Sequence, residues 1–135
     1  MKIMRLVVLF AAFALVGSRV PSLAHHSPSA EFDRKKAVTL TGVVTKVEWV
    51  NPHAWFYVDV KDPRTGDIMN WAFELVSPNS LERRGWSKDT LKTGDVVSVD
   101  GFLSRDGGHK VDAQRVRLSD GRSVLTNSAE GSTTR

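Results

Sequence analysis

The chain has 135 residues, of which 19 are Lys or Arg and 15 are Asp or Glu, giving a formal net charge of +4. It contains no cysteine, which excludes a disulfide framework and any metal site built on thiolates. A chain of this length accommodates one domain with a modest hydrophobic core.

The first residues have the pattern of a secretory signal peptide. Two basic residues precede an unbroken apolar run of 11 residues at 6–16, which is short for a bilayer span of roughly 20 residues. Ser22 and Ala24 then supply small side chains at positions −3 and −1 of a cleavage site before His25. We interpret 1–24 as a signal peptide. We therefore expect an exported protein, periplasmic or secreted, with no membrane span after cleavage.

Cleavage would change the charge balance of the chain. Three of the basic residues lie within 1–24, so 16 basic and 15 acidic residues would remain. The basic pairs Arg83-Arg84 and Arg115/Arg117 are short, and we interpret them as a solvated helix end and the wet face of a strand. Nucleic-acid binding proteins usually carry a basic stripe beside aromatic residues. The sequence therefore predicts no nucleic-acid partner.

Residues 25–37 form a leader without a sustained period, opening on the pair His25-His26. The domain is predicted to span 38–125. Small and polar residues make up 126–135, and this composition is typical of a disordered tail.

The domain opens with three predicted strands. The first, 38–50, is rich in β-branched residues and carries Gly42 as an expected bend or bulge. Asn51-Pro52 ends it. The second, 54–60, alternates, with Trp55, Tyr57 and Asp59 on one face, and that face should be the wetter one. The third strand is 68–75.

A short helix is predicted next. Ser77 suits the N-cap, Pro78 the first helical position and Gly85 the residue after the C-cap, which together indicate about two turns. Strands at 96–103 and 111–118 and a short one at 123–125 follow. Three strands, one helix and two strands is the order of an OB-fold. The predicted fold class is all-β with one short helix, a five-stranded OB-like barrel with the helix between strands 3 and 4. An open sheet crossed by a helix is the alternative.

Several blocks of the chain together form a recognisable combination. They are Ala-His-His-Ser at 24–27, Thr-Gly-Val-Val-Thr-Lys-Val-Glu-Trp-Val-Asn-Pro-His-Ala at 41–54, and the segments 71–75, 77–79, 83–86 and 91–95. This combination resembles a family of small exported bacterial proteins, the domain of unknown function 6152, over roughly 25–124. The resemblance implies no particular activity. A weaker similarity to small periplasmic OB-fold proteins rests on the strand order and on the Thr-Gly-Val-Val start of the first strand.

The histidine pair at the expected mature terminus suggests a metal site. If cleavage falls before His25, the α-amine and imidazole of that residue can chelate one metal ion. His26, His53 or His109 could supply a second imidazole. We take His25, His26 and His53 as the candidate metal ligands, and Cu(II) is the ion that such nitrogen ligands favour. The alternative is a polar terminus that binds metal only adventitiously, with no cofactor.

A second set of residues suggests a ligand surface. His53 either shapes the turn after Asn51-Pro52 or serves as a binding residue on a loop held by a rigid scaffold. Most aromatic residues are needed in the core, but Trp55 and Tyr57 share a face with an aspartate and are the best candidates for an exposed stacking surface. His109 lies on the loop between the last two long strands. His53, Trp55, Tyr57 and His109 are therefore the candidate ligand-binding residues.

Motifs of catalysis are missing from the sequence. There is no Gly-x-Ser-x-Gly, no phosphate-binding loop and no His-Glu-x-x-His, so we expect no enzyme. The predicted function is a non-catalytic binding module that presents a barrel face and loops to a small molecule, a glycan or an envelope protein. One alternative is a copper-binding protein centred on His25. Another is a structural envelope component, which would expose a free strand edge or an apolar patch.

Overall fold

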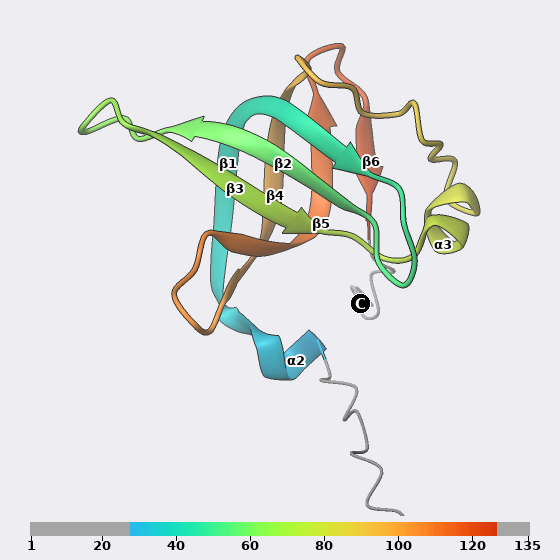
Figure 1. Cartoon of the computed structure of the whole chain (residues 1–135), viewed down its shortest axis with the longest axis horizontal. Coiled ribbons are helices and arrows are strands. Elements are labelled where there is room, and N and C mark those ends of the chain that lie inside the picture. The colour runs from blue at the N-terminus through green and yellow to red at the C-terminus, as the bar shows by residue number, and fades with distance from the viewer. Residues whose placement is uncertain (1–27, 127–135) are drawn as a thin grey trace, which may run out of the picture.

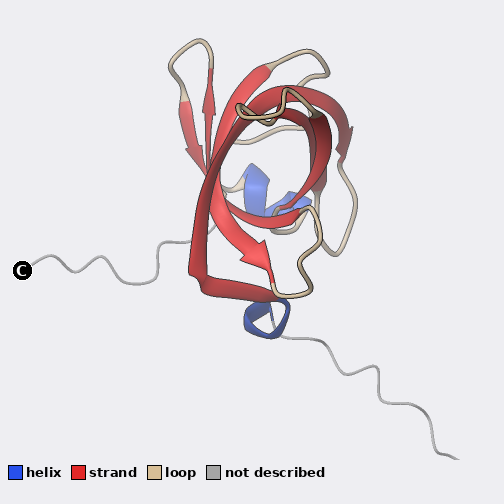
Figure 2. Cartoon of the chain, turned by 90° about the vertical axis from the view of Figure 1, so that its left-hand side faces the viewer, coloured by secondary structure: helices blue, strands red, loops and turns tan. Residues whose placement is uncertain are grey.

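The structure, a computed structural model, describes residues 28–126 and consists mainly of β-strands (Figures 1 and 2). Two short helices accompany them, α2 (Pro28–Glu31) and α3 (Pro78–Glu82). The strands are β1 (Phe32–Glu48), β2 (Trp55–Lys61), β3 (Ile68–Glu74), β4 (Val96–Ser104), β5 (Lys110–Leu118) and β6 (Ser123–Leu125). The all-β class and the helix between β3 and β4 are confirmed, and α2 is an additional turn that the sequence pattern did not indicate.

Five of the strands close into a ring, which Figure 2 shows as strands curving around a common centre. β1 pairs antiparallel with both β2 and β4, β2 pairs with β3, and β4 pairs with β5. The ring closes where β3 runs parallel to β5, with Ala72–Glu74 opposite Lys110–Asp112. β6 pairs with a later part of β5, Arg115–Arg117, on the same edge as β3, and is not part of the ring. This closure is the OB-like arrangement that we predicted, and the open sheet is wrong.

β1 begins at Phe32 instead of at Val38. Phe32 is 2% exposed and pairs with Ser104 at the end of β4. The backbone N–H of Arg105 also donates to the carbonyl of Glu31 at 2.9 Å. The second half of the predicted leader is therefore part of the sheet. Its run of charged residues lacks the alternating apolar pattern from which a strand is predicted.

Gly42 lies where β1 pairs on both sides, opposite Val60 and Val97. A Cβ at this position would come within 2.1 Å of the carbonyl oxygen of Asp59. Glycine is required here because the backbones of β1 and β2 approach too closely for a side chain. The irregularity that we expected at Gly42 falls further along, between Val44 and Lys46.

The core fills the ring with alternate residues of every ring strand. Phe56 and Phe73 stack at its centre, with ring centroids 4.9 Å apart and planes 13° apart. Burial of such rings is the main stabilising contribution available to a domain of this size. Residues after β3 join the same cluster, and each is at most 3% exposed: Leu75, Leu81, Trp86 and Leu91.

Ser77 caps α3 by accepting a hydrogen bond from the N–H of Ser80 at 3.4 Å.

The C-terminal end of the described chain is tied to the sheet. Thr126, which we expected in the disordered tail, is fully buried, and its N–H donates to Gln114 at 3.0 Å. The predicted signal peptide, the pair His25-His26 and the rest of the tail lie outside the described residues. No helix within 28–126 is long and apolar enough to cross a membrane.

Candidate functional site

The outer face of β2 carries the two aromatic residues that the sequence singled out. Phe56 and Val58 point into the core and are fully buried. Trp55 and Tyr57 alternate with them, so they lie on the outer side of the ring and are half-buried. We call the outer side of β1, β2 and β3 the outer face.

Polar side chains from β1 surround the ring of Tyr57. Its hydroxyl donates to Oε2 of Glu48 at 3.1 Å. The ammonium of Lys46 pairs with Glu48 and lies 5.4 Å from the centroid of the Tyr57 ring. The hydrogen bond from Lys46 holds the pKa of Glu48 below its ordinary value. Burial, followed by the hydrogen bond to Glu48, raises the pKa of Tyr57. These groups fix one another's positions.

A second polar group lies one step further along the same face. The amide of Asn70 donates to Oδ1 of Asp59 at 2.7 Å and to the hydroxyl of Thr45 at 3.1 Å. Asn70 and Asp59 are direct partners across β2 and β3. The outer face therefore presents two aromatic rings beside acceptors and donors that are already ordered by hydrogen bonds.

His53 lies at the end of this face, just before β2, and Nδ1 of its imidazole bonds Oε1 of Glu74. Its side chain is 41% exposed. The loop is anchored beside this pair, because Ala54 donates to the carbonyl of Val76 at 3.2 Å and accepts from Leu75 at 2.9 Å. The bond at Nδ1 leaves Nε2 as the ring nitrogen available to a ligand.

Glu74 is the functional candidate that the sequence pattern did not single out. It is 9% exposed, and its second oxygen, Oε2, is buried without a hydrogen-bond partner among the described residues. A buried carboxylate is costly unless it is paired. The position of Glu74 between the core residues Phe73 and Leu75 is the signal that could have pointed to such a partner.

His109 does not join the other candidates. Its ring is tilted by 52° against Trp71 with centroids 4.7 Å apart. Trp71 pairs with the core residue Val58 and so faces the interior side of β3, opposite to the outer face. The two rings line a groove of about 370 Å³ beneath the β2–β3 hairpin, together with Leu40, Val60 and Met69.

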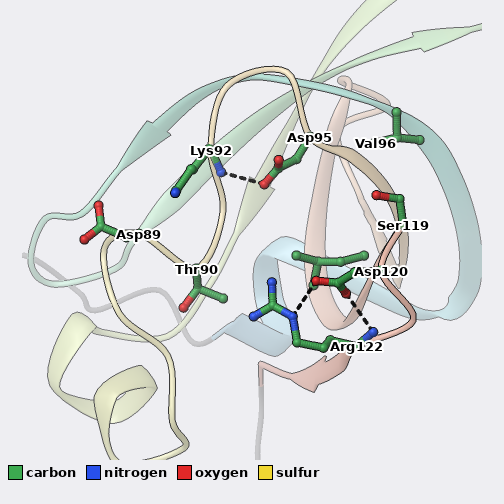
Figure 3. A pocket seen from close by; sticks show the side chains of 9 residues that line it. Asp89, Thr90, Lys92, Asp95, Val96, Ser119, Asp120 and Arg122 are labelled. Atoms are coloured by element: carbon green, nitrogen blue, oxygen red, sulfur yellow. Dashed lines mark hydrogen bonds and ion pairs between the residues drawn. The ribbon is translucent and has the colours of Figure 1, made fainter.

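A further depression, of about 170 Å³, lies between the loop before β4 and the β5–β6 turn (Figure 3). Polar residues that the sequence did not single out line most of it. The N–H of Lys92 donates to Asp95 at 2.8 Å, and Arg122 donates to Asp120 through its backbone at 2.9 Å and its side chain at 2.6 Å. These hydrogen bonds stabilise two turns, so the polar residues of the depression have a structural role that requires no bound ligand.

The N-terminal segment of the described chain is tied to strand β5. Glu31 of α2 pairs with the ammonium of Lys110 on β5. That ammonium lies 5.8 Å from the centroid of the Phe32 ring. The hydrogen bond to Glu31 raises the pKa of Lys110, and the charges of Asp106 and Glu74 add to this effect. Lys110 therefore bonds Glu31 directly and is also attracted by the charge of Glu74.

Among the candidate metal ligands, only His53 belongs to the described residues. Within 28–126, no three or more His, Asp or Glu side chains are grouped closely enough to hold a metal ion. A metal site at His53 would therefore need donors from outside these residues.

Comparison with solved structures shows a likeness to the mitochondrial single-stranded DNA-binding protein Rim1 of S. cerevisiae. The identity is 9%, the TM-score is 0.49, and the alignment covers 66% of this chain and 95% of that one. Our exclusion of nucleic acid is contradicted by this finding, because the similar protein binds single-stranded DNA. A near-neutral charge was not a sufficient reason for the exclusion.

No curated protein matches this chain. A family model does match it, over residues 13–112, which is most of the sequence. The match includes the strands β1 to β4 and the residues His53, Trp55, Tyr57 and Glu74. The chain therefore belongs to the family of unknown function DUF6152.

Proposed function

We propose that this chain is an exported, non-catalytic binding module that binds a glycan on the outer face of β1, β2 and β3. The observation that supports it best is the position of Trp55 and Tyr57. The two rings lie two residues apart on β2, a separation of about 7 Å along the strand. They are half-buried beside polar groups that are already ordered.

The chemistry of this face suits a neutral, polyhydroxylated ligand. Sugar rings have an apolar C–H side that packs on an aromatic ring, and their hydroxyls donate to carboxylates. Glu48 and Asp59 offer such acceptors next to the rings. Because Tyr57 and Asn70 already hold these carboxylates in place, little side-chain freedom would be lost on binding.

The direct test is a glycan array followed by calorimetry with the purified protein. We expect glycan binding that weakens at least tenfold in W55A and in Y57A. The matched control is T41A, which removes an exposed hydroxyl from β1 that bonds Ser98 away from the two rings. Thermal unfolding of each variant shows whether the fold is retained.

The same calorimetry includes a mixed-sequence single-stranded oligonucleotide at two salt concentrations. Binding of a glycan that depends on Trp55 and Tyr57 supports the proposal. If no glycan binds and the oligonucleotide does, with the salt dependence that phosphate contacts produce, the ligand class is nucleic acid and the glycan proposal fails.

A further inference from the structure

The first half of β3 has an open edge. Successive residues of a strand direct their backbone N–H and C=O groups to opposite sides. The N–H of Ala72 donates to the carbonyl of His109 at 2.9 Å, so the backbone groups of Ala72 point away from β2. Those of Ile68 and Asn70 point the same way, but the pairing with β5 begins only at Ala72. Ile68 and Asn70 therefore have N–H and C=O groups without a backbone partner within residues 28–126.

This edge is exposed and apolar. Ile68 is 65% exposed and Met69 is 39% exposed, and the β2–β3 hairpin that carries them projects from the ring (Figure 1). Met69 also lines the apolar groove beneath the hairpin, beside Leu40 and Val60. The segment 68–71 contains neither the lysine nor the proline that commonly protects an exposed edge. An edge of this kind is a template for pairing with another strand.

A second copy of the same strand satisfies every open group of this edge. If two copies of β3 run antiparallel about a two-fold axis at Met69, Ile68 of each copy lies opposite Asn70 of the other. Residues opposite each other in this way exchange both of their N–H to C=O hydrogen bonds. The pairing ends at Trp71, because the next N–H, that of Ala72, already donates to His109.

The side chains agree with this register. Opposite residues of an antiparallel pair share a face, so Met69 of each copy covers the apolar groove of the other, and methionine adapts well to irregular apolar surfaces. Asp67 of one copy lies opposite Trp71 of the other, on which the ring of His109 stacks at 4.7 Å. Asp67 and His109 both line the groove. A carboxylate of the second copy thus meets an imidazole, which has an N–H to donate.

We propose that the protein forms a symmetric dimer by antiparallel pairing of β3 with β3 of a second copy, centred on Met69. The contact is short compared with a standard interface of about 1,600 Å², so the dimer forms as the protein concentration rises. The proposal goes beyond glycan binding and does not depend on it. In the dimer, the outer faces of the two copies become one continuous surface.

Cysteine cross-linking tests the register. The natural chain contains no cysteine, so a single introduced thiol reports on one contact. Met69 and its counterpart form a non-hydrogen-bonded pair, whose Cα atoms lie about 4.5 Å apart, and this separation permits a disulfide. The matched control is V96C, because Val96 is 48% exposed on β4, away from the edge. Under mild oxidation, M69C should form the linked dimer roughly tenfold faster than V96C, since only M69C has this geometry.

Sedimentation velocity tests the association without a thiol. The natural chain should shift from monomer to dimer as its concentration is raised. M69K places a charge in the middle of the edge, as natural protected edges do, and should remain a monomer. V96K makes the same change on β4 and should associate like the natural chain. Thermal unfolding of each variant verifies that the fold is retained.

Three results would overturn the proposal. The first is a natural chain that is monomeric at every concentration. The second is M69C and V96C cross-linking at the same rate. The third is a dimer that V96K disrupts and M69K does not, which would place the interface on β4. If the chain is monomeric and an extended synthetic peptide binds unless M69K is present, the occupant of the edge is a strand of another protein and the dimer is wrong. These measurements contain no glycan, so failure of the dimer and failure of the proposed function are distinguishable.

Discussion

Glu74, the last residue of β3, holds the imidazole of His53, which lies 21 positions earlier in the chain on the loop before β2. The loop before β2 and the strand β3 are thereby joined through two side chains. A bond to Nδ1 decides which nitrogen of a neutral imidazole carries the proton.

We expect the neutral form of His53 to carry its proton on Nδ1, with Nε2 free. Nitrogen NMR with long-range proton coupling distinguishes the two tautomers. In E74A the commoner Nε2-protonated form should become dominant, because the acceptor at Nδ1 is gone. The signals of His109 should not change. A spectrum of His53 that is the same in both proteins would show that Glu74 does not orient the ring in solution.

The second prediction concerns the close approach of β1 and β2. G42A should lower the free energy of unfolding by about 1–3 kcal/mol or more, since the new methyl group must displace the carbonyl of Asp59. The comparison is G108A, where the nearest atom to a new Cβ is an oxygen of the Asp106 side chain, 3.1 Å away. Urea unfolding measures both, and equal losses would argue against a specific backbone contact at Gly42.

The third prediction concerns acid sensitivity. Asp100 accepts hydrogen bonds from Arg117 at 2.7 and 2.8 Å and from Thr39 at 2.8 Å. The bond from Arg117 is the main cause that lowers the pKa of Asp100 in the folded protein. Because the folded pKa is the lower one, this stabilisation is present above the unfolded pKa of about 3.9 and is lost as pH falls through the folded pKa.

D100N should therefore be less stable than the natural chain at pH 7, by no more than about 1 kcal/mol because solvent screens this partly exposed pair. The difference should shrink as pH falls through the folded pKa and vanish well below it, where the carboxyl is protonated in both states. Thermal melts from pH 7 to pH 2 give the comparison, with D89N as an exposed control. A difference that is constant with pH would mean that the Arg117 pair is not its cause.

The fourth prediction concerns the end of the domain. The hydroxyl of Thr126 donates to the carbonyl of Ala113, and Arg84 donates to the carbonyl of Thr126 at 2.7 Å. T126V keeps the shape but leaves a buried carbonyl without its donor, which should cost about 1–2 kcal/mol. T41V, at an exposed hydroxyl, is the control. If T126V and the natural chain have the same free energy of unfolding, Thr126 belongs to the disordered tail, as the composition of 126–135 predicted.

The arrangement of the fold followed from local patterns in the sequence. Alternation identified β2 and its two faces, and Ser77 with Pro78 identified α3, because these signals act over a few residues. The early start of β1 could not be read in this way. Phe32 is a single apolar residue before a run of charges, and its burial depends on Ser104, which is distant in the chain.

The candidate site was predicted less completely, for a related reason. Trp55 and Tyr57 lie on the outer face because the alternation of one strand dictates it. The partnership of His53 with Glu74 and the separation of His109 depend on how three strands and two loops meet. Periodicity along one segment carries no information on such meetings. The place of Glu74 between two core residues indicates that its carboxylate needs a partner, but it does not indicate that this partner is His53.

The parallel pairing of β3 and β5 has a consequence for how the domain opens. It is three positions long, the shortest of the pairings that close the ring, so local opening should begin there at the smallest cost. When this seam parts, the β2–β3 hairpin separates from β5, and Glu74 moves with it. A ligand bound at His53, which Glu74 holds in place, would stabilise the closed ring and slow amide exchange of the residues paired between β3 and β5. Occupancy of the site would then depend on the ring being closed.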